Sequence, residues 1–106
     1  MKTFPIFFSF FLAGFLLGCS AEQQLDNIKQ IERKGRYYKA WEKYQEFAAS
    51  HPQHPRAPEA LLALANCQVE MKDNRGARRT LDELMKSYPK SEAAAAGKER
   101  LATIKG

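Results

Sequence analysis

The chain has 106 residues, a formal net charge of +5 at pH 7 and two cysteines. This length suffices for one small domain, and two cysteines are too few for a framework of disulfide bonds. The positive excess is mild and suits a nearby anionic membrane or envelope polymer. No run of like charges reaches the density of a nucleic-acid-binding tail, so a nucleic-acid partner is not expected.

The first element in the chain is a signal peptide, predicted over residues 1–18. Lys2 supplies a positive start, and residues 4–17 are almost wholly apolar. This stretch is too short to span a bilayer, which needs about 20 residues, but has the length of the apolar core of a secretory signal. The alternative is a buried helix. The segment is apolar on every side, however, and the remaining chain is too small to surround it.

The run from Leu16 to Ser20 (LLGCS) resembles the lipobox of bacterial lipoproteins. This resemblance implies cleavage after Gly18, lipid attachment (palmitate-type acyl chains) at the Cys19 sulfur, and a lipidated tether over residues 19–24. In that lipoprotein family an Asp after the cysteine tends to retain the protein in the inner membrane, so Ser20 implies the outer membrane, facing the periplasm. Because each buried methylene contributes about 0.8 kcal/mol, two or three acyl chains give a lasting anchor. The alternative is an ordinary secreted protein in which Cys19 is an unmodified thiol.

The rest of the chain, residues 25–106, lacks the alternation of apolar and polar residues that is typical of strands, and its pattern predicts an all-α domain. Five helical stretches are expected, at roughly 22–34, 36–49, 57–72, 75–87 and 92–105. Prolines and Gly35 separate them, Asp73-Asn74 and Ser91 provide caps, and Pro58 is tolerated in a first helical turn. We therefore expect a short solenoid of about five helices after the signal segment.

The helical stretches repeat at an offset of 37 residues. Aligning Pro52 with Pro89 places apolar or small residues on the same helical face in both copies. The paired positions are Ala40 with Ala77, Tyr44 with Leu81, Phe47 with Leu84, Leu64 with Leu101, and Cys67 with Ile104. A sustained period in this range indicates a protein of stacked repeats.

At these residues the chain resembles the tetratricopeptide repeat. The run from Gly35 to Ala40 matches the turn and start of the second helix of that motif, while Leu64-Ala65 matches the first helix. The repeat-defining positions are Gly35, Tyr37, Ala40, Pro52, Leu64, Ala77 and Pro89. In the second copy Lys72 replaces the turn glycine. The resemblance implies two helix pairs and a C-terminal capping helix.

The loop from Pro52 to Pro58 is typical of envelope members of this family. Examples are the lipoprotein of the outer-membrane β-barrel assembly machine and the Tol-Pal coordinator protein. In the family, the first helix of each pair lines a concave groove that binds partners. The positions predicted to line that groove here are Glu59, Leu62, Asn66, Val69 and Glu70. Leu62 and Val69 lie off the main packing face; the alternative is that both pack on neighbouring helices.

No residue set predicts catalysis, a metal site or a cofactor. The spacing of His51 and His54 is not that of a helical metal-binding pair, so an ordinary loop is favoured. Cys67 lies in an apolar stripe and is interpreted as a small buried hydrophobe, with a reactive thiol as the alternative. There is no phosphate-binding loop and no nucleophile motif, so an enzyme is not expected.

The resulting functional hypothesis is a membrane-anchored adaptor that scaffolds a complex of the bacterial cell envelope. Its partner is expected to be an envelope protein or peptide. The alternative is a structural spacer that binds peptidoglycan or a lipid surface. A basic stretch near the anchor could attract anionic headgroups or an acidic partner; its residues are Lys29, Arg33, Lys34, Arg36, Lys39 and Lys43. Since glutamates interrupt this stretch, a solvated helix face is favoured over both of these roles.

Overall fold

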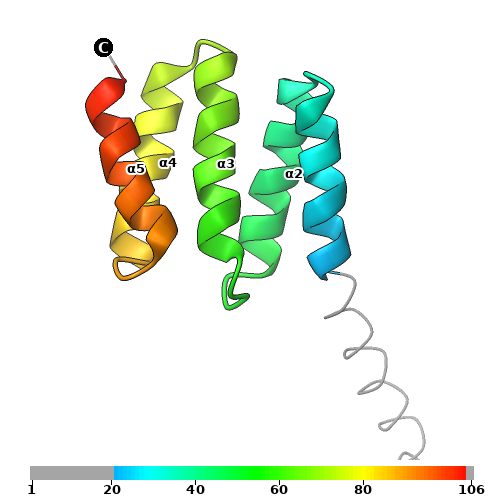
Figure 1. The fold of residues 1–106 in the computed structure, drawn as a ribbon, viewed down its shortest axis with the longest axis horizontal. Coiled ribbons are helices and arrows are strands. Elements are labelled where there is room, and N and C mark those ends of the chain that lie inside the picture. The colour runs from blue at the N-terminus through cyan, green and yellow to red at the C-terminus, as the bar shows by residue number, and fades with distance from the viewer. Residues whose placement is uncertain (1–20, 105–106) are drawn as a thin grey trace, which may run out of the picture.

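The computed structural model describes residues 21–104, and these form five helices without a strand (Figure 1). The N-terminal helix occupies 21–33 of this range. It is followed by α2 (Tyr37–Ser50), α3 (Ala57–Glu70), α4 (Asn74–Ser87) and α5 (Glu92–Thr103). The all-α prediction is confirmed, although α3 ends two residues earlier than the sequence pattern indicated. The predicted signal peptide and Cys19 lie outside the described residues. Residues 21–24, expected to belong to the tether, form the first described turn of helix.

The helices form two layers, and the helices of one layer run antiparallel to those of the other. In Figure 1 the N-terminal helix, α3 and α5 lie in front, with α2 and α4 behind them. Packing joins α2 to α3, α3 to α4, and α5 to both α4 and α3. None of the helices in the described range is long and apolar enough to cross a membrane. The resulting array is a short stack of helix pairs closed by α5.

Local side chains fix where two helices begin. Asp73 caps α4, since its Oδ1 accepts a hydrogen bond from the amide of Gly76 at 3.0 Å. Ser91 caps α5 in the same way through the amide of Ala94, also at 3.0 Å. Each cap satisfies an amide that has no partner within its own helix. Both predicted caps are confirmed.

The turn inside each helix pair needs one residue in the left-handed backbone region. Gly35 has a φ of +80° in the first pair, and Lys72 has a φ of +68° in the second. Glycine adopts this conformation without a steric penalty, whereas a residue with a Cβ pays about 1–2 kcal/mol. The second turn therefore keeps the geometry of the first despite having lost its glycine.

The 37-residue offset describes the core of α2 and α4. Ala40 and Ala77 are both 0% exposed, and Tyr44 and Leu81 occupy equivalent, fully buried positions. The two loops at the opposite end from these turns are also joined, because the Tyr88 hydroxyl donates to the carbonyl of Pro52 at 2.7 Å. The 37-residue repeat is therefore present in the structure as well as in the sequence.

The offset holds less well in the last helix. Leu101 and Ile104 are only half-buried, whereas their counterparts Leu64 and Cys67 are buried. The reason is position. α3 packs between α2 and α4, whereas the packing partners of α5 in this array, α4 and α3, lie on one side of it.

Candidate functional site: a cleft in the front helix layer

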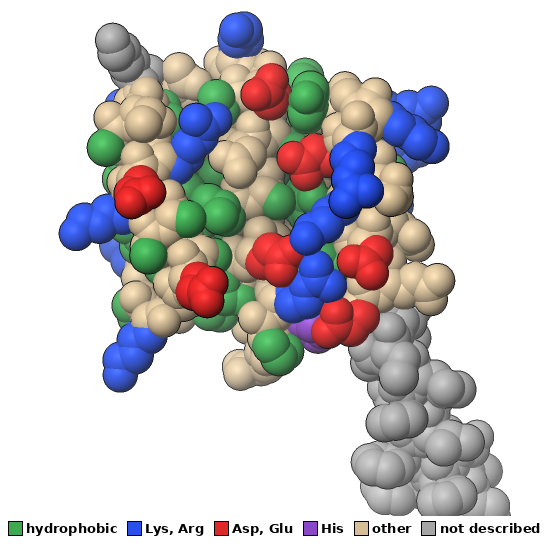
Figure 2. Space-filling view, in the orientation of Figure 1, with side chains coloured by type: hydrophobic (Ala, Val, Ile, Leu, Met, Phe, Trp, Pro, Cys, Tyr) green, Lys and Arg blue, Asp and Glu red, His purple; other side chains and the backbone are tan. Residues whose placement is uncertain are grey.

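A cleft between the N-terminal helix and α3 contains three of the five predicted groove residues. Its volume is about 290 Å³. It is lined by Lys29, Glu32, Arg33, Tyr44, Glu59, Leu62, Ala63 and Asn66. Val69 and Glu70, the other two predicted residues, do not line it. Figure 2 views the molecule from this side and shows charged side chains of both signs beside apolar ones.

Two of the cleft's lining residues, Glu59 and Lys29, belong to a cluster of ion pairs centred on Arg56. Its guanidinium contacts both oxygens of Glu59 at 3.0 Å and a Glu22 oxygen at 2.9 Å, with Asp26 at 3.5 Å. Lys29 also pairs with Glu59. The hydrogen bonds from Arg56, followed by those from Lys29, lower the pKa of Glu59 to about 2. Glu59 is thus already neutralised within the molecule, and it fixes the N-terminal helix to α3.

The other predicted residues differ in how much surface they leave accessible. Asn66 accepts a hydrogen bond at 3.1 Å from Nε of Arg100, which connects α3 to α5. Leu62 and Val69 are half-buried and pack against the core, so each side chain combines the two roles weighed from the sequence. Glu70 is exposed. Of this set, Leu62 is the apolar side chain that reaches the cleft.

Arg33 supplies the cleft with a cation that makes no ion pair within residues 21–104. Its side chain is exposed, and it lies on the same cleft wall as Lys29, whose ammonium is held by Glu59. The hydroxyl of the buried Tyr44, which also lines the cleft, donates to Oε1 of Glu32 at 2.6 Å. The cleft lining therefore combines an unpaired guanidinium with the apolar side chains of Leu62 and Ala63. This combination suits an acidic segment that also carries an apolar side chain.

Sequence reasoning missed Arg56 and the pair of Tyr44 and Glu32. Arg56 follows a proline in a loop, and its partners Glu22 and Asp26 lie at least 30 positions earlier in the chain. No local pattern indicates contacts over such separations. The apolar spacing of Tyr44 predicted its burial but not the acceptor of its hydroxyl.

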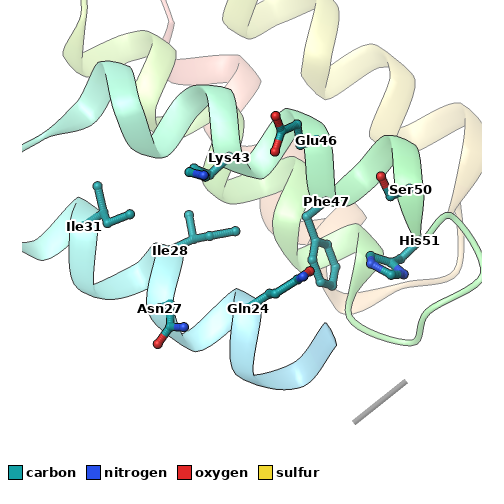
Figure 3. Close-up of a pocket in the computed structure, with 9 residues that line it drawn as sticks. All are labelled: Gln24, Asn27, Ile28, Ile31, Lys43, Glu46, Phe47, Ser50 and His51. Carbon is teal, nitrogen blue, oxygen red and sulfur yellow. The ribbon is translucent and has the colours of Figure 1, made fainter. Parts of the chain in front are cut away.

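A second cavity, of about 400 Å³, lies between the N-terminal helix and α2 (Figure 3). Ile28, Ile31 and Phe47 form its apolar part, and polar side chains such as Gln24 and Lys43 surround them. In a longer solenoid, this edge of the array would pack against a preceding helix pair. It is a second, less charged surface at which another chain could dock.

The two histidines have structural roles in the loop after α2. Their rings pack against Phe47, with centroid distances of 4.9 Å for His51 and 5.6 Å for His54. Nδ1 of His54 also accepts a hydrogen bond from the Arg56 amide at 3.0 Å. Within the described part of the chain, no group of three or more potential metal-ligating side chains occurs.

Cys67 is fully buried in α3, as its place in the apolar stripe predicted. Burial, with smaller contributions from Glu32 and Glu70, raises the pKa of its thiol to about 12. The sulfur is therefore protonated and inaccessible at neutral pH, which is unfavourable for a nucleophile.

Stacked helix pairs with a cleft in one layer define a helical repeat protein whose surfaces are suited to interaction. Comparison with known families is consistent with this architecture, since residues 33–101 match the tetratricopeptide repeat. The chain belongs to the tetratricopeptide repeat family. Repeats of this kind generally mediate protein–protein interaction and are generally not catalytic. No curated protein matches the chain.

Proposed function

We propose that this protein is a membrane-anchored adaptor that helps to assemble a protein complex of the bacterial cell envelope. The observation that carries the proposal is the cleft between the N-terminal helix and α3. It combines the unpaired Arg33 with the partly accessible Leu62 in a family of protein-binding repeats. The partner is a protein or peptide segment with acidic and apolar side chains.

The anchor in this proposal is lipid at Cys19, supported by the lipobox-like run from Leu16 to Ser20. The described helix begins at Ala21, only two residues beyond Cys19. Two residues span at most about 7 Å, so an anchored sulfur would hold the helix array close to the bilayer. Ser20 after the cysteine supports the outer membrane, with the array facing the periplasm.

The cleft is tested by placing a photo-crosslinking amino acid at position 62 of the full chain in cells. We expect one discrete protein adduct, and we expect Arg33→Glu to remove it because the acidic partner would then be repelled. The matched control is Lys98→Glu, which reverses an exposed charge in α5. Crosslinks of equal yield from position 82 on α4, or an adduct unaffected by Arg33→Glu, would contradict the proposal.

The anchor is tested separately, by incorporation of labelled palmitate and by membrane fractionation. We expect label on the wild-type chain, and neither label nor outer-membrane fractionation for Cys19→Ala. Cys67→Ala serves as the control, because that thiol is buried and should not carry the lipid. Label that persists in Cys19→Ala would disprove lipidation at this residue.

A further inference from the structure

A third cavity lies between α2 and α4, the two helices behind α3 in Figure 1. Its volume is about 330 Å³. The lining residues are Trp41, Gln45, Gln68, Asp73, Gly76, Arg79, Thr80 and Glu83. None of these residues lines the cleft of the front layer, so the two sites are separate. Binding at this cavity is therefore independent of the front cleft and of the proposed adaptor function.

This cavity is lined by the side-chain amide of Gln68, a buried residue of α3. Gln68 is 7% exposed, and its Oε1 accepts from the Thr80 hydroxyl at 2.7 Å. Its Nε2 makes no hydrogen bond to any other described residue. This nitrogen lies 3.0 Å from the point that a Cβ on Gly76 would occupy, so the absence of a side chain at Gly76 leaves room around it. Within the described residues no buried side-chain nitrogen or oxygen lacks a partner, so this nitrogen is one that a molecule in the cavity can reach.

Acceptors and further donors surround that amide. Oδ1 of Asp73 accepts a hydrogen bond from the amide of Gly76. The carboxyl group of Asp73 and Nε2 of Gln68 both lie beside the α-carbon of this glycine. Gln45, Arg79 and Glu83 are exposed and complete the rim. The cavity is lined by two carboxylates and one guanidinium, and this excess of negative charge disfavours an anionic ligand. Because most of the lining side chains are polar, the cavity also disfavours a lipid chain. The mixture of donors and acceptors instead suits a neutral ligand with many hydroxyl or amide groups.

An aromatic wall completes the site. Trp41 is half-buried and lines the cavity, and its ring lies 5.9 Å, between centroids, from that of Tyr38. The negative face of an indole attracts the weakly positive C–H groups of an aliphatic ring. A pyranose sugar presents such a C–H face together with adjacent hydroxyl groups.

We propose that this cavity binds one neutral pyranose unit of a glycan. The ring packs on Trp41, a sugar oxygen accepts from Nε2 of Gln68, and hydroxyls pair with Asp73, Gln45 and Glu83. The cavity lies on the opposite layer from the front cleft, so a glycan and a protein partner can bind at the same time.

Trp41 is the only tryptophan of the chain, so its fluorescence reports on this cavity directly. The full-length protein is kept in a polyoxyethylene detergent that carries no sugar, and is titrated with an N-acetylglucosamine tetramer and with a glucose tetramer. We expect a saturable change with at least one tetramer. The double variant Gln45→Ala/Glu83→Ala should weaken binding about tenfold, as two hydrogen bonds are lost.

The matched control is Gln53→Ala/Asp82→Ala, which also removes one exposed amide and one exposed carboxylate but none from the cavity. It should leave the titration unchanged. Circular dichroism establishes that both variants keep their helices, and the single variant Gln45→Ala should show a smaller loss of the same sign. The proposal is overturned if neither tetramer gives a saturable response or if the cavity variants bind as the wild type does. Equal affinity for the peptide Ser-Asn-Gln-Ser would assign the cavity to peptides instead.

Discussion

Tyr44 shows how a single buried side chain joins two helices. It is 0% exposed, and its hydroxyl donates at 2.6 Å to Glu32 of the N-terminal helix. Burial, followed by this hydrogen bond, raises the pKa of the phenol, so the donor stays protonated. We expect Tyr44→Phe to lower the free energy of unfolding by about 1–2 kcal/mol, since a hydrogen bond to a charged acceptor is lost.

The measurement for Tyr44→Phe is chemical denaturation monitored by circular dichroism. Tyr38→Phe is the control, because Tyr38 is 58% exposed and its hydroxyl makes no hydrogen bond within the described residues. Its unfolding free energy should match that of the wild type. Equal stability of the two variants would show that the contact between Tyr44 and Glu32 contributes nothing.

Lys72 has a backbone conformation that favours glycine over a residue with a side chain. Its φ of +68° costs a non-glycine residue about 1 kcal/mol or more. We expect Lys72→Gly to stabilise the protein by roughly that amount, reduced by the greater entropy of glycine in the unfolded chain. Gly35→Ala, at a φ of +80°, should be destabilising in the same denaturation experiment. A loss of stability in Lys72→Gly would contradict this account of the turn.

At the scale of one element, α5 depends on a close approach to α4. A Cβ on Gly97 would lie 3.0 Å from a terminal carbon of Leu84 and 3.2 Å from one of Leu81. Both leucines are 0% exposed, so they have little space into which to move. We expect Gly97→Val to destabilise the fold by about 1–3 kcal/mol through overpacking, and to loosen α5 first.

Thermal unfolding and amide hydrogen exchange check this prediction for α5. The control is Ala96→Val, which introduces the same branched side chain at the adjacent, exposed position. It should cost only the small helix propensity difference of valine. Equal melting temperatures for the two variants would mean that Gly97 does not set the distance between α5 and α4.

At the scale of the whole molecule, the ion pairs around Glu59 link the two helix pairs. Its pKa is lowered from 4.5 to about 2, first by Arg56 and then by Lys29. A lowered folded-state pKa stabilises the protein above the unfolded value of 4.5, and this stabilisation is lost as pH falls towards 2. Because 38% of the side chain is exposed, solvent screening limits the contribution to no more than about 1 kcal/mol.

We therefore expect the free energy of unfolding to fall between neutral pH and about pH 3, and to fall less in Glu59→Gln. Denaturation at several pH values measures this difference. Glu46→Gln is the control, since Glu46 is exposed and has no ion pair within residues 21–104. It should keep the wild-type pH dependence, and an identical profile for all three proteins would refute the linkage.

The positions of the helices follow from short-range chemistry. Asp73 and Ser91 cap helices whichever partners those helices later meet, and Gly35 and Pro52 interrupt helices because of their own backbone limits. The 37-residue repeat similarly predicted small residues on the buried faces of α2 and α4, as at Ala40 and Ala77. These local signals were sufficient to predict an all-α repeat protein.

The cleft and the cavities could not be predicted from local sequence signals in the same way. Arg56 meets Glu22, Arg100 meets Asn66, and Tyr88 meets Pro52, each across 34 to 36 positions. Such contacts depend on how the helices cross, and no spacing within one helix encodes them. The same holds for the cavity over Gln68. The sequence by itself determined the helices and their repeat because those are set within a few residues. Only the tertiary structure decided which side chains share a cleft, because that requires the helices to be packed.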